Sequence, residues 1–201
     1  MKNQIINIAD IRAGTAFREA IQHDEAGGVA IVQAGDVKAN GELEVETLVR
    51  VKETAFCGDL PVVAEGEVLL QCRGQNYRAA VVPAHNRPLV PTASVLILTP
   101  GPQVSPEYLA HFLNDPITQA ELRTLATGAR IANLKRSSLE QLQVLVPSIE
   151  DQKRIVAYGE TLREISRLEA RLAGLRRTEL RAFLEECSKR NRGRWRVPGP
   201  F

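Results

Sequence analysis

The sequence predicts an α+β fold, in which a mixed β-sheet with helices is followed by one long C-terminal coiled-coil-like helix. Three observations predict it. Short apolar runs rich in β-branched residues, separated by Gly and Pro, fill most of residues 1–100, as is typical of strands. From Ser105 the apolar residues recur at helical spacing, and residues 150–189 contain no proline and only two glycines. A chain of 201 residues accommodates one domain plus an appendage.

The strands are predicted from compact apolar runs that end at turn residues. Val29–Gln33 follows two glycines, and Asn40-Gly41 is a hairpin-turn signal. Further strands are expected at Leu48–Val51, Leu60–Val63, Val68–Arg73, Tyr77–Val82, Ala93–Leu98 and Val144–Pro147. Residues 16–25 fit either a short helix or an irregular arm, and residues 83–91 are expected to form a proline-punctuated loop.

Three short helices are expected between these strands. Ser105-Pro106-Glu107 combines an N-cap residue, a proline at the first helical position and an acidic first turn. Asn114-Asp115-Pro116 interrupts this helix, and a second helix then carries Ile117–Leu125. Leu134–Leu142 is expected to form a third helix, capped at Ser137-Ser138.

A long amphipathic helix is expected after Pro147. Its apolar residues follow one another at intervals of three and four, as in a coiled coil: Tyr158, Leu162, Ile165, Leu168, Leu172 and Leu175. This face either folds back on its own domain or meets a partner helix. Forty helical residues span about 60 Å, which a compact domain of this size does not cover, so a partner helix is the better hypothesis.

The composition excludes several classes of protein. The formal charge is +2, with 26 Lys and Arg against 24 Asp and Glu, so a nonspecific coat for nucleic acid is not expected. Cys57, Cys72 and Cys187 form no CxxC pair, and with only three His they predict no metal site. No signal peptide or membrane-spanning run is found, which favours a soluble, cytoplasmic protein. Phosphate-loop, HExxH and GxSxG motifs are also missing, so neither a cofactor nor a catalytic residue is predicted.

Several short motifs occur in an order that is similar to a known family. They are Ile8–Phe17, Ile31–Gln33 with Asp36-Val37, Gly66–Leu70 with Arg73-Gly74, Pro106–Leu109, Leu113, Thr127-Gly128, Leu134, Leu139, and Pro147, Ile149, Gln152 and Ile155. Together they resemble the target-recognition domain of the DNA specificity subunits of type I restriction-modification systems. Two features depart from that family. Glu67 stands where the usual hairpin has Asp, and the chain has one recognition domain and one helix where the usual subunit has two of each.

The resemblance implies a fold like that of a target-recognition domain and a role in phage defence. It implies that residues 1–148 form a DNA target-recognition domain, residues 149–188 a long spacer or dimerisation helix, and residues 189–201 a basic flexible tail. The expected partners are double-stranded DNA and the DNA methyltransferase (modification) subunit. Because only half of the usual subunit is present, the chain is expected to act as a homodimer through its C-terminal helix or as a stand-alone accessory of a methyltransferase.

Candidate DNA-binding residues are the Arg, Lys, Asn, Gln and His side chains in loops beside the expected strands, because phosphates and base edges require such groups. They are Arg73, Gln75, Asn76, Arg78, His85, Asn86, Arg87, Arg130, Asn133, Lys135 and Arg136. Each competes with the simpler interpretation of a solvated surface residue, and Arg136 also with that of a residue that complements a helix. Arg12 and Arg18 are weaker candidates.

Two other functions compete with DNA recognition. A protein-interaction adaptor would use the C-terminal helix alone, and the near-neutral net charge favours it slightly. A nuclease would need acidic metal ligands clustered on strands, and no such cluster is placed convincingly in the sequence.

Overall fold

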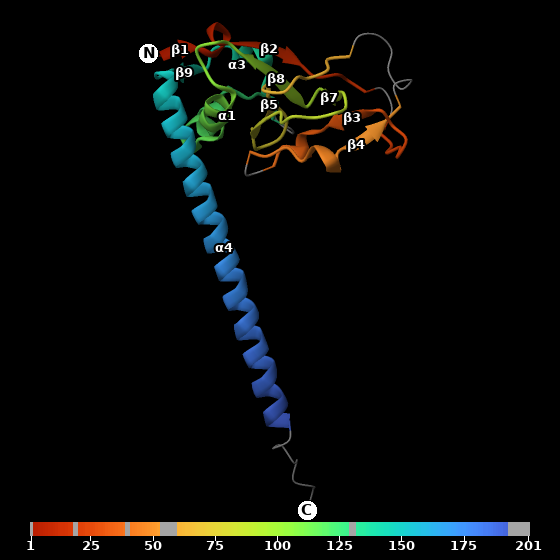
Figure 1. Ribbon diagram of the computed structural model, residues 1–201, viewed down its shortest axis with the longest axis vertical. Helices are drawn as coiled ribbons and strands as arrows, with labels where there is room; N and C mark the ends of the chain where they lie inside the picture. Colours follow the sequence, from red (N-terminus) through yellow and green to blue (C-terminus); the bar gives the residue numbers. More distant parts are fainter. Residues whose placement is uncertain (1, 18–19, 39–40, 53–59, 129–131, 193–201) are drawn as a thin grey trace, which may run out of the picture. The chain divides into compact units, whose positions relative to one another are not determined.

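The computed structural model describes residues 2–17, 20–38, 41–52, 60–128 and 132–192, with side chains described up to Lys189. The chain divides into two compact units, residues 1–157 and residues 158–201. The first unit carries the strands and the short helices, and the described part of the second continues the long helix α4 (Figure 1).

The largest sheet of the first unit has four antiparallel strands (Figure 1). Its order is β2 (Ala9–Ala13), β8 (Val95–Pro100), β5 (Val68–Gln71) and β6 (Ala79–Val81). β5 and β6 form a hairpin, and β6 is an outer strand of the sheet.

Two smaller sheets complete the strands of the first unit. β3 (Val29–Val32) lies between β4 (Val49–Val51), to which it is antiparallel, and β7 (Leu89–Pro91), to which it is parallel. β1 (Lys2–Gln4) pairs with β9 (Gln143–Leu145) in a two-stranded antiparallel sheet. The described strands therefore form a mixed β structure, as the α+β prediction requires.

Two of the three described short helices begin at a side-chain cap, and of these two caps the sequence predicts the one at Ser105. The Ser105 hydroxyl accepts a hydrogen bond from the backbone N–H of Tyr108 and caps α1 (Pro106–Asn114). Asp115 caps α2 (Pro116–Leu125) in the same way. The exception is α3 (Arg136–Leu139). Three short 3-10 turns, at Ile5–Asn7, Ala34–Asp36 and Val45–Thr47, complete the helical elements of the described part of this unit.

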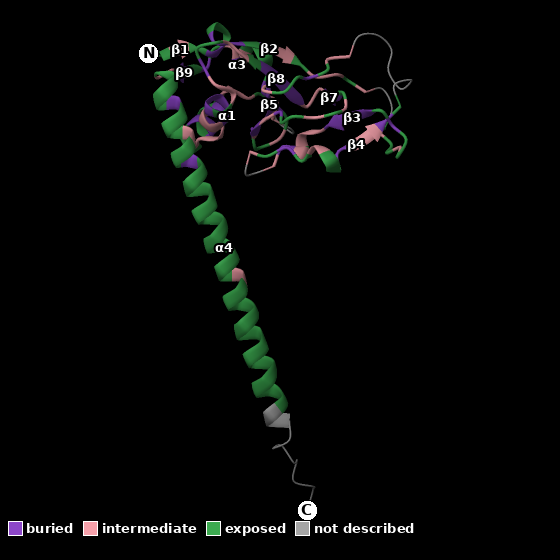
Figure 2. Ribbon diagram, viewed as in Figure 1, coloured by how far each residue is buried: buried purple, intermediate pink, exposed green. Residues whose placement is uncertain are grey.

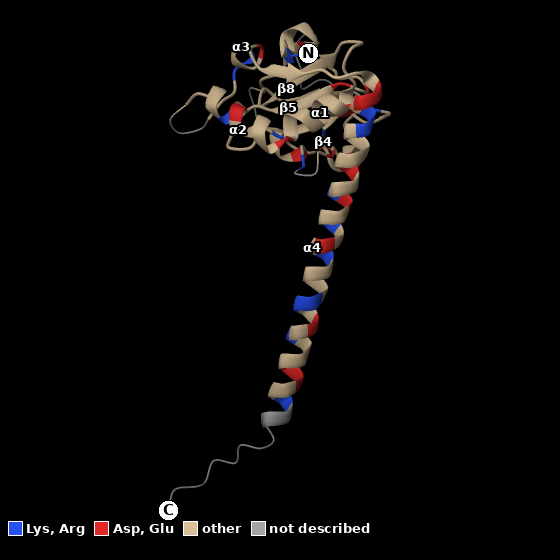
Figure 3. Ribbon diagram, turned by 90° about the vertical axis from the view of Figure 1, so that its left-hand side faces the viewer, with Lys and Arg blue, Asp and Glu red and all other residues tan. Residues whose placement is uncertain are grey.

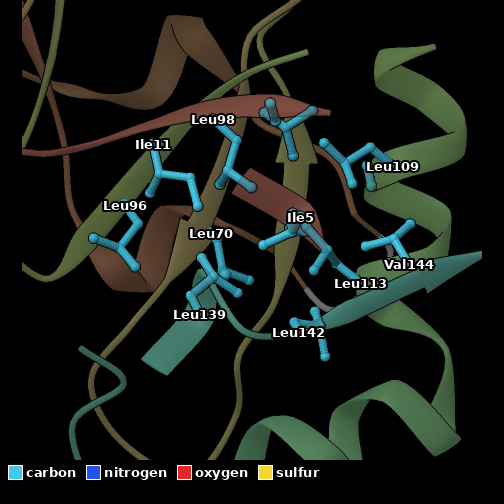
Figure 4. Close-up of a cluster of buried hydrophobic side chains, with 14 of the residues drawn as sticks. Ile5, Ile11, Leu70, Leu96, Leu98, Leu109, Leu113, Leu139, Leu142 and Val144 are labelled. Carbon is cyan, nitrogen blue, oxygen red and sulfur yellow. The ribbon is translucent and has the colours of Figure 1, made fainter. Parts of the chain in front are cut away.

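The four-stranded sheet buries both of its faces, since successive side chains of a strand point to opposite sides. Leu70 and Leu98 face the core that α1, α2 and α3 cover, together with Ile5, Leu113, Leu142 and Val144 (Figure 4). Leu69 and Ile97, next to them in sequence, face the second core, against β3 and β7. The apolar runs of β5 and β8 therefore lack a polar alternate position, which is why they appear continuous in the sequence, whereas β2 keeps Asp10 and Arg12 at its alternate positions.

One expected strand is wrong. Leu60–Val63 forms no ladder, and only Val63 makes an isolated bridge to Leu89. Pro61 has no N–H to donate, and the N–H of Val62 bonds to the carbonyl of Leu60 at 2.7 Å, which makes a tight local turn.

The expected loop at residues 83–91 is also partly wrong, because Leu89–Pro91 forms strand β7. Because prolines are typical of loops, the prolines around this strand made the sequence indicate a loop here. Pro91 is tolerated because β7 lies at the edge of its sheet, where a missing N–H breaks no central ladder.

The third helix is shorter than expected, and its predicted cap is misplaced. It begins after Lys135 rather than at Ser137-Ser138, and no side chain caps it. The N–H of Leu134 bonds instead to the carbonyl of Cys72 at 2.8 Å, which keeps this backbone extended up to the helix start. The described part of residues 16–25 is irregular, and Asn40 of the predicted hairpin turn lies outside the described residues.

Helix α4 runs from Ile149 to Arg192, four residues beyond the expected boundary at 188. A helix of 44 residues is about 66 Å long. The six residues predicted to bind a partner helix, from Tyr158 to Leu175, are exposed by 45% to 68%. Figure 2 shows α4 exposed along most of its length. Residues 193–201 of the predicted tail lie outside the described residues.

Candidate nucleic-acid interface

The tip of the β5–β6 hairpin is joined to a segment far away in the sequence. The backbone N–H of Gly74 donates to the carbonyl of Ala132 at 2.9 Å, and the N–H of Leu134 donates to Cys72. Arg73 and Asn133 thus face one another in a single antiparallel bridge. Gly74 has a φ of 102°, a conformation that residues with a Cβ rarely adopt. The structure therefore brings two of the predicted DNA-binding loops together.

A second backbone bridge closes the loop that follows α2. Thr127 and Asn133 exchange two hydrogen bonds, at 3.0 and 2.8 Å, and Gly128 turns the chain with a φ of 126°. Asn133 therefore holds this loop and the hairpin tip at once. Arg130 lies outside the described residues.

The predicted side chains at this tip differ in exposure. Arg73, Gln75, Asn76 and Lys135 are exposed, whereas Arg78 and Asn133 are half-buried. Such exposed amide and guanidinium groups are the chemical types that bind base edges and phosphates.

Arg136, another predicted DNA-binding residue, is engaged in an ion pair. Its Nε lies 2.8 Å from a carboxylate oxygen of Glu140, the residue that follows α3. This pairing favours the simpler interpretation, in which Arg136 complements its own helix. Figure 3 shows a basic and an acidic residue close together at α3.

The loop with His85, Asn86 and Arg87 is not part of this tip. It follows β6 at the end of the hairpin where Val82 bonds to Glu67, the end opposite Gly74. The Nδ1 atom of His85 lies 2.9 Å from the carbonyl oxygen of Pro83, so the loop is held by a contact within itself. The structure therefore separates the predicted residues into two groups.

Arg12 is engaged in an ion pair, which favours a structural role for it, while the weaker DNA-binding prediction for it stays a prediction. Its Nη2 lies 2.6 Å from a carboxylate oxygen of Glu67, and it also donates to the carbonyl of Val62. Burial raises the pKa of Glu67, but hydrogen bonds from Arg12, Thr99 and the N–H of Ala64 outweigh this effect, and the pKa is lowered. This ion pair joins β2 to the turn before β5. Arg18 lies outside the described residues.

Arg123 belongs to the hairpin tip, although sequence reasoning missed it. Its Nε donates to the backbone carbonyl of Gln75 at 3.3 Å. Arg123 is an exposed residue near the end of α2, where a basic residue is expected on any solvated helix. Nothing in the sequence pattern signals its contact with a loop 48 positions away.

Neither a metal-binding cluster nor a membrane-spanning helix is found among the described residues. No three His, Cys, Asp or Glu side chains in the described part of the chain gather closely enough to hold a metal ion. None of the described helices combines the length and the apolar character that a membrane crossing needs.

Comparison with known proteins places this architecture in a family. A family model described as the type I restriction modification DNA specificity domain matches residues 2–173. The curated type I restriction enzyme StySPI specificity subunit of Salmonella potsdam is 34% identical over 65 residues, which are 32% of this chain and 14% of that protein.

Solved structures share the fold at low sequence identity. A type I R-M system structure, described as the basis of complex assembly and conformational transition, has a TM-score of 0.64 and 16% identity, covering 91% of this chain and 43% of the other. The HsdS subunit of Thermoanaerobacter tengcongensis gives 0.59 and 21%, covering 82% and 37%. The S subunit of the type I restriction-modification system of M. genitalium gives 0.54 and 14%, covering 79% and 37%.

These likenesses confirm the predicted α+β fold with its long C-terminal helix. The chain spans less than half the length of the solved chains that it matches. Since the family model covers residues 2–173, the chain belongs to the family of type I restriction modification DNA specificity domains.

Proposed function

We propose that this chain is a sequence-specific double-stranded DNA-binding specificity subunit, which directs a partner DNA methyltransferase or restriction complex to its target site. The observation that carries the proposal is the bridge between Arg73 and Asn133, which unites two polar loops into one exposed tip. Family membership supports the same role. A tip built from extended backbone and exposed polar side chains is suited to entering a DNA groove.

Within this proposal the side chains of the tip have different roles. Arg73 and Lys135 bind phosphates, and Gln75 and Asn76 are placed to read base edges, for which amides are the usual partners of adenine. Arg78, Arg130, Asn133 and Arg136 support the same surface. His85, Asn86 and Arg87 form a second contact region at the other end of the hairpin.

The long helix is proposed to bind protein. Residues 1–148 recognise DNA, residues 149–188 contact the methyltransferase subunit or a second copy of the chain, and residues 189–201 form a basic tail. The exposed face from Tyr158 to Leu175 supports this assignment, because apolar side chains at spacings of three and four are stabilised when a partner helix covers them.

The chemistry is assigned to the partner. In this proposal the chain has no catalytic residue and needs no cofactor or metal of its own, and it acts in the cytoplasm. Methyl transfer and cleavage belong to the subunits that it brings to the DNA.

A protein-interaction adaptor without DNA recognition is the second candidate, and the exposed face of α4 also fits it. Replacing Arg130, Lys135 and Arg136 together separates the two functions. A specificity subunit loses DNA binding and keeps its protein partner, whereas an adaptor keeps the partner and loses nothing else.

The direct test begins with a pull-down of the tagged chain from its native cell extract. Bound sequences are then selected from a random duplex pool, with and without the recovered partner. Enrichment of a short defined motif, with a methyltransferase in the pull-down, supports the specificity subunit. No motif under either condition refutes it and leaves the adaptor.

A further inference from the structure

Among the described strands, none pairs with the outer edge of β6, and side chains of α1 and α2 take the place of one. The amide of Asn114 accepts from the N–H of Ala79 at 2.9 Å and donates to the carbonyl of the same residue at 2.7 Å. The amide of Gln119 makes the same pair of bonds to Tyr77, at 3.3 and 2.6 Å. Arg123 then bonds to the carbonyl of Gln75.

These contacts fall on alternate residues, Gln75, Tyr77 and Ala79, of the segment that leads into β6. In extended backbone, the N–H and C=O groups of alternate residues face the same side, so Tyr77 and Ala79 share one edge, and the carbonyl of Gln75, in the bend before them, is the next group contacted. Asn114, Gln119 and Arg123 therefore form a side-chain ladder, which continues the sheet edge beyond the end of β6 up to the exposed tip. Buried and edge backbone groups need such partners, and the ladder supplies them.

The last member of the ladder differs from the first two. Asn114 and Gln119 are uncharged and packed, whereas Arg123 is exposed and charged. Within the described part of the chain Arg123 makes no ion pair, in contrast to Arg12 and Arg136, which pair with carboxylates. In the part of the chain that the structure describes, only its Nε makes a hydrogen bond, to the carbonyl of Gln75, so the N–H groups of both Nη atoms remain available as donors.

We propose that Arg123 is a DNA phosphate-binding residue, held in place by the carbonyl of Gln75, and that the side-chain ladder aligns it with the recognition tip. An arginine fixed through Nε presents its two Nη groups as a planar fork, which matches the geometry of a phosphate. The proposal rests on the DNA-binding function given above, and it adds α2 to a surface otherwise made of loops.

The test is the salt dependence of DNA binding by the full chain, together with the partner recovered in the pull-down. The duplexes are the selected motif and a scrambled sequence of the same length. Each phosphate contact contributes about one unit to the slope of log K against log salt concentration. Arg123→Gln removes the charge, Arg123→Lys keeps it without the fork, and Lys2→Gln removes an exposed charge from the separate β1–β9 sheet as a matched control.

We expect Arg123→Gln to lower the slope by about one unit, with the same fold-loss of affinity on both duplexes. Arg123→Lys and Lys2→Gln are expected to keep the slope of the unmodified chain. Urea unfolding checks that the variants stay folded. A slope unchanged in Arg123→Gln, or lowered equally in Lys2→Gln, overturns the proposal. If the unmodified chain does not prefer the motif over the scrambled duplex, the proposed function itself has failed.

Discussion

The side-chain amide of Gln152, in the second turn of α4, accepts a hydrogen bond from the backbone N–H of Ser105 at 2.8 Å. Ser105 in turn caps α1. The same amide donates to the carbonyls of Gln103 and Pro147, at 2.9 and 3.0 Å, and is fully buried. One glutamine therefore ties the first turns of α4 to the start of α1 within the first unit.

Gln152→Leu is expected to lower the free energy of unfolding by about 2–4 kcal/mol. A leucine fills the space but leaves one N–H and two carbonyls without their partner, and unpaired buried groups are costly. Urea unfolding followed by circular dichroism measures the change. Lys153→Leu, at the exposed neighbouring position, is the matched control. Equal stability of the two variants would show that these hydrogen bonds contribute little.

Glu67 is expected to make stability depend on pH in the acidic range. Its pKa in the folded chain is lowered from an ordinary value of 4.5. The stabilisation that the ionised Glu67 contributes is therefore complete above about pH 4.5, and it is lost as the pH falls through the folded pKa, which lies below that value. In Glu67→Gln an amide N–H faces the Arg12 guanidinium, and we expect this change to lower the free energy of unfolding by about 1–3 kcal/mol at neutral pH. Urea unfolding at neutral and acidic pH should show that this difference shrinks on acidification. A difference that stays constant with pH contradicts the role given to the charge.

Gly14 lies where backbone segments approach too closely for any side chain. A Cβ built there is 2.2 Å from the carbonyl oxygen of Thr92 and 2.5 Å from that of Pro91. Gly14→Ala is therefore expected to destabilise the chain by about 2 kcal/mol or more, because backbone has to move. Gly174→Ala in α4 meets nothing within 4 Å and is expected to be neutral or to stabilise the helix by up to about 1 kcal/mol. Thermal unfolding compares the two variants, and equal midpoints would contradict the close approach.

Gln75 and Asn76 are expected to contribute to sequence preference rather than to general affinity. Their alanine variants should lose about 1–3 kcal/mol of binding to the selected duplex while binding a scrambled duplex as before, since amides read base edges. Fluorescence anisotropy with both duplexes measures the difference. Gln143→Ala, in the separate β1–β9 sheet, is the matched control. Equal losses on both duplexes would assign these residues to backbone contacts instead.

The exposed face of α4 is expected to hold the protein partner. Leu168→Lys combined with Leu172→Lys places charge in that face and should abolish helix association, while the unfolding of the first unit stays unchanged. Light scattering and the pull-down measure association. Arg171→Ala, between the two leucines in sequence, serves as control. If both leucines can be replaced without loss of a partner, the helix serves another purpose.

Local chemistry explains which parts of the fold the sequence predicts. Ser105 and Asp115 cap helices through bonds to residues two or three positions away, so their patterns are visible in a few residues. The shortened third helix is different. Its start depends on the N–H of Leu134, which bonds to Cys72 more than sixty positions earlier, and no local pattern reports such a bond.

The same distinction holds for the candidate site. Loop composition was enough to select Arg73 and Lys135, because polar residues between strands are visible in the sequence. The separation of Arg87 from them, and the inclusion of Arg123, follow from which end of the β5–β6 hairpin each segment meets. Tertiary pairing decides this, and sequence spacing alone does not.

The contacts that join the hairpin tip to residues 132–134 are made by backbone atoms, and side chains take no part in them. A mutation at Arg73 or Asn133 therefore changes the chemistry offered to a ligand while the pairing that supports it persists. A scaffold of this kind can acquire a new preference by single substitutions at its surface, without first evolving a new fold.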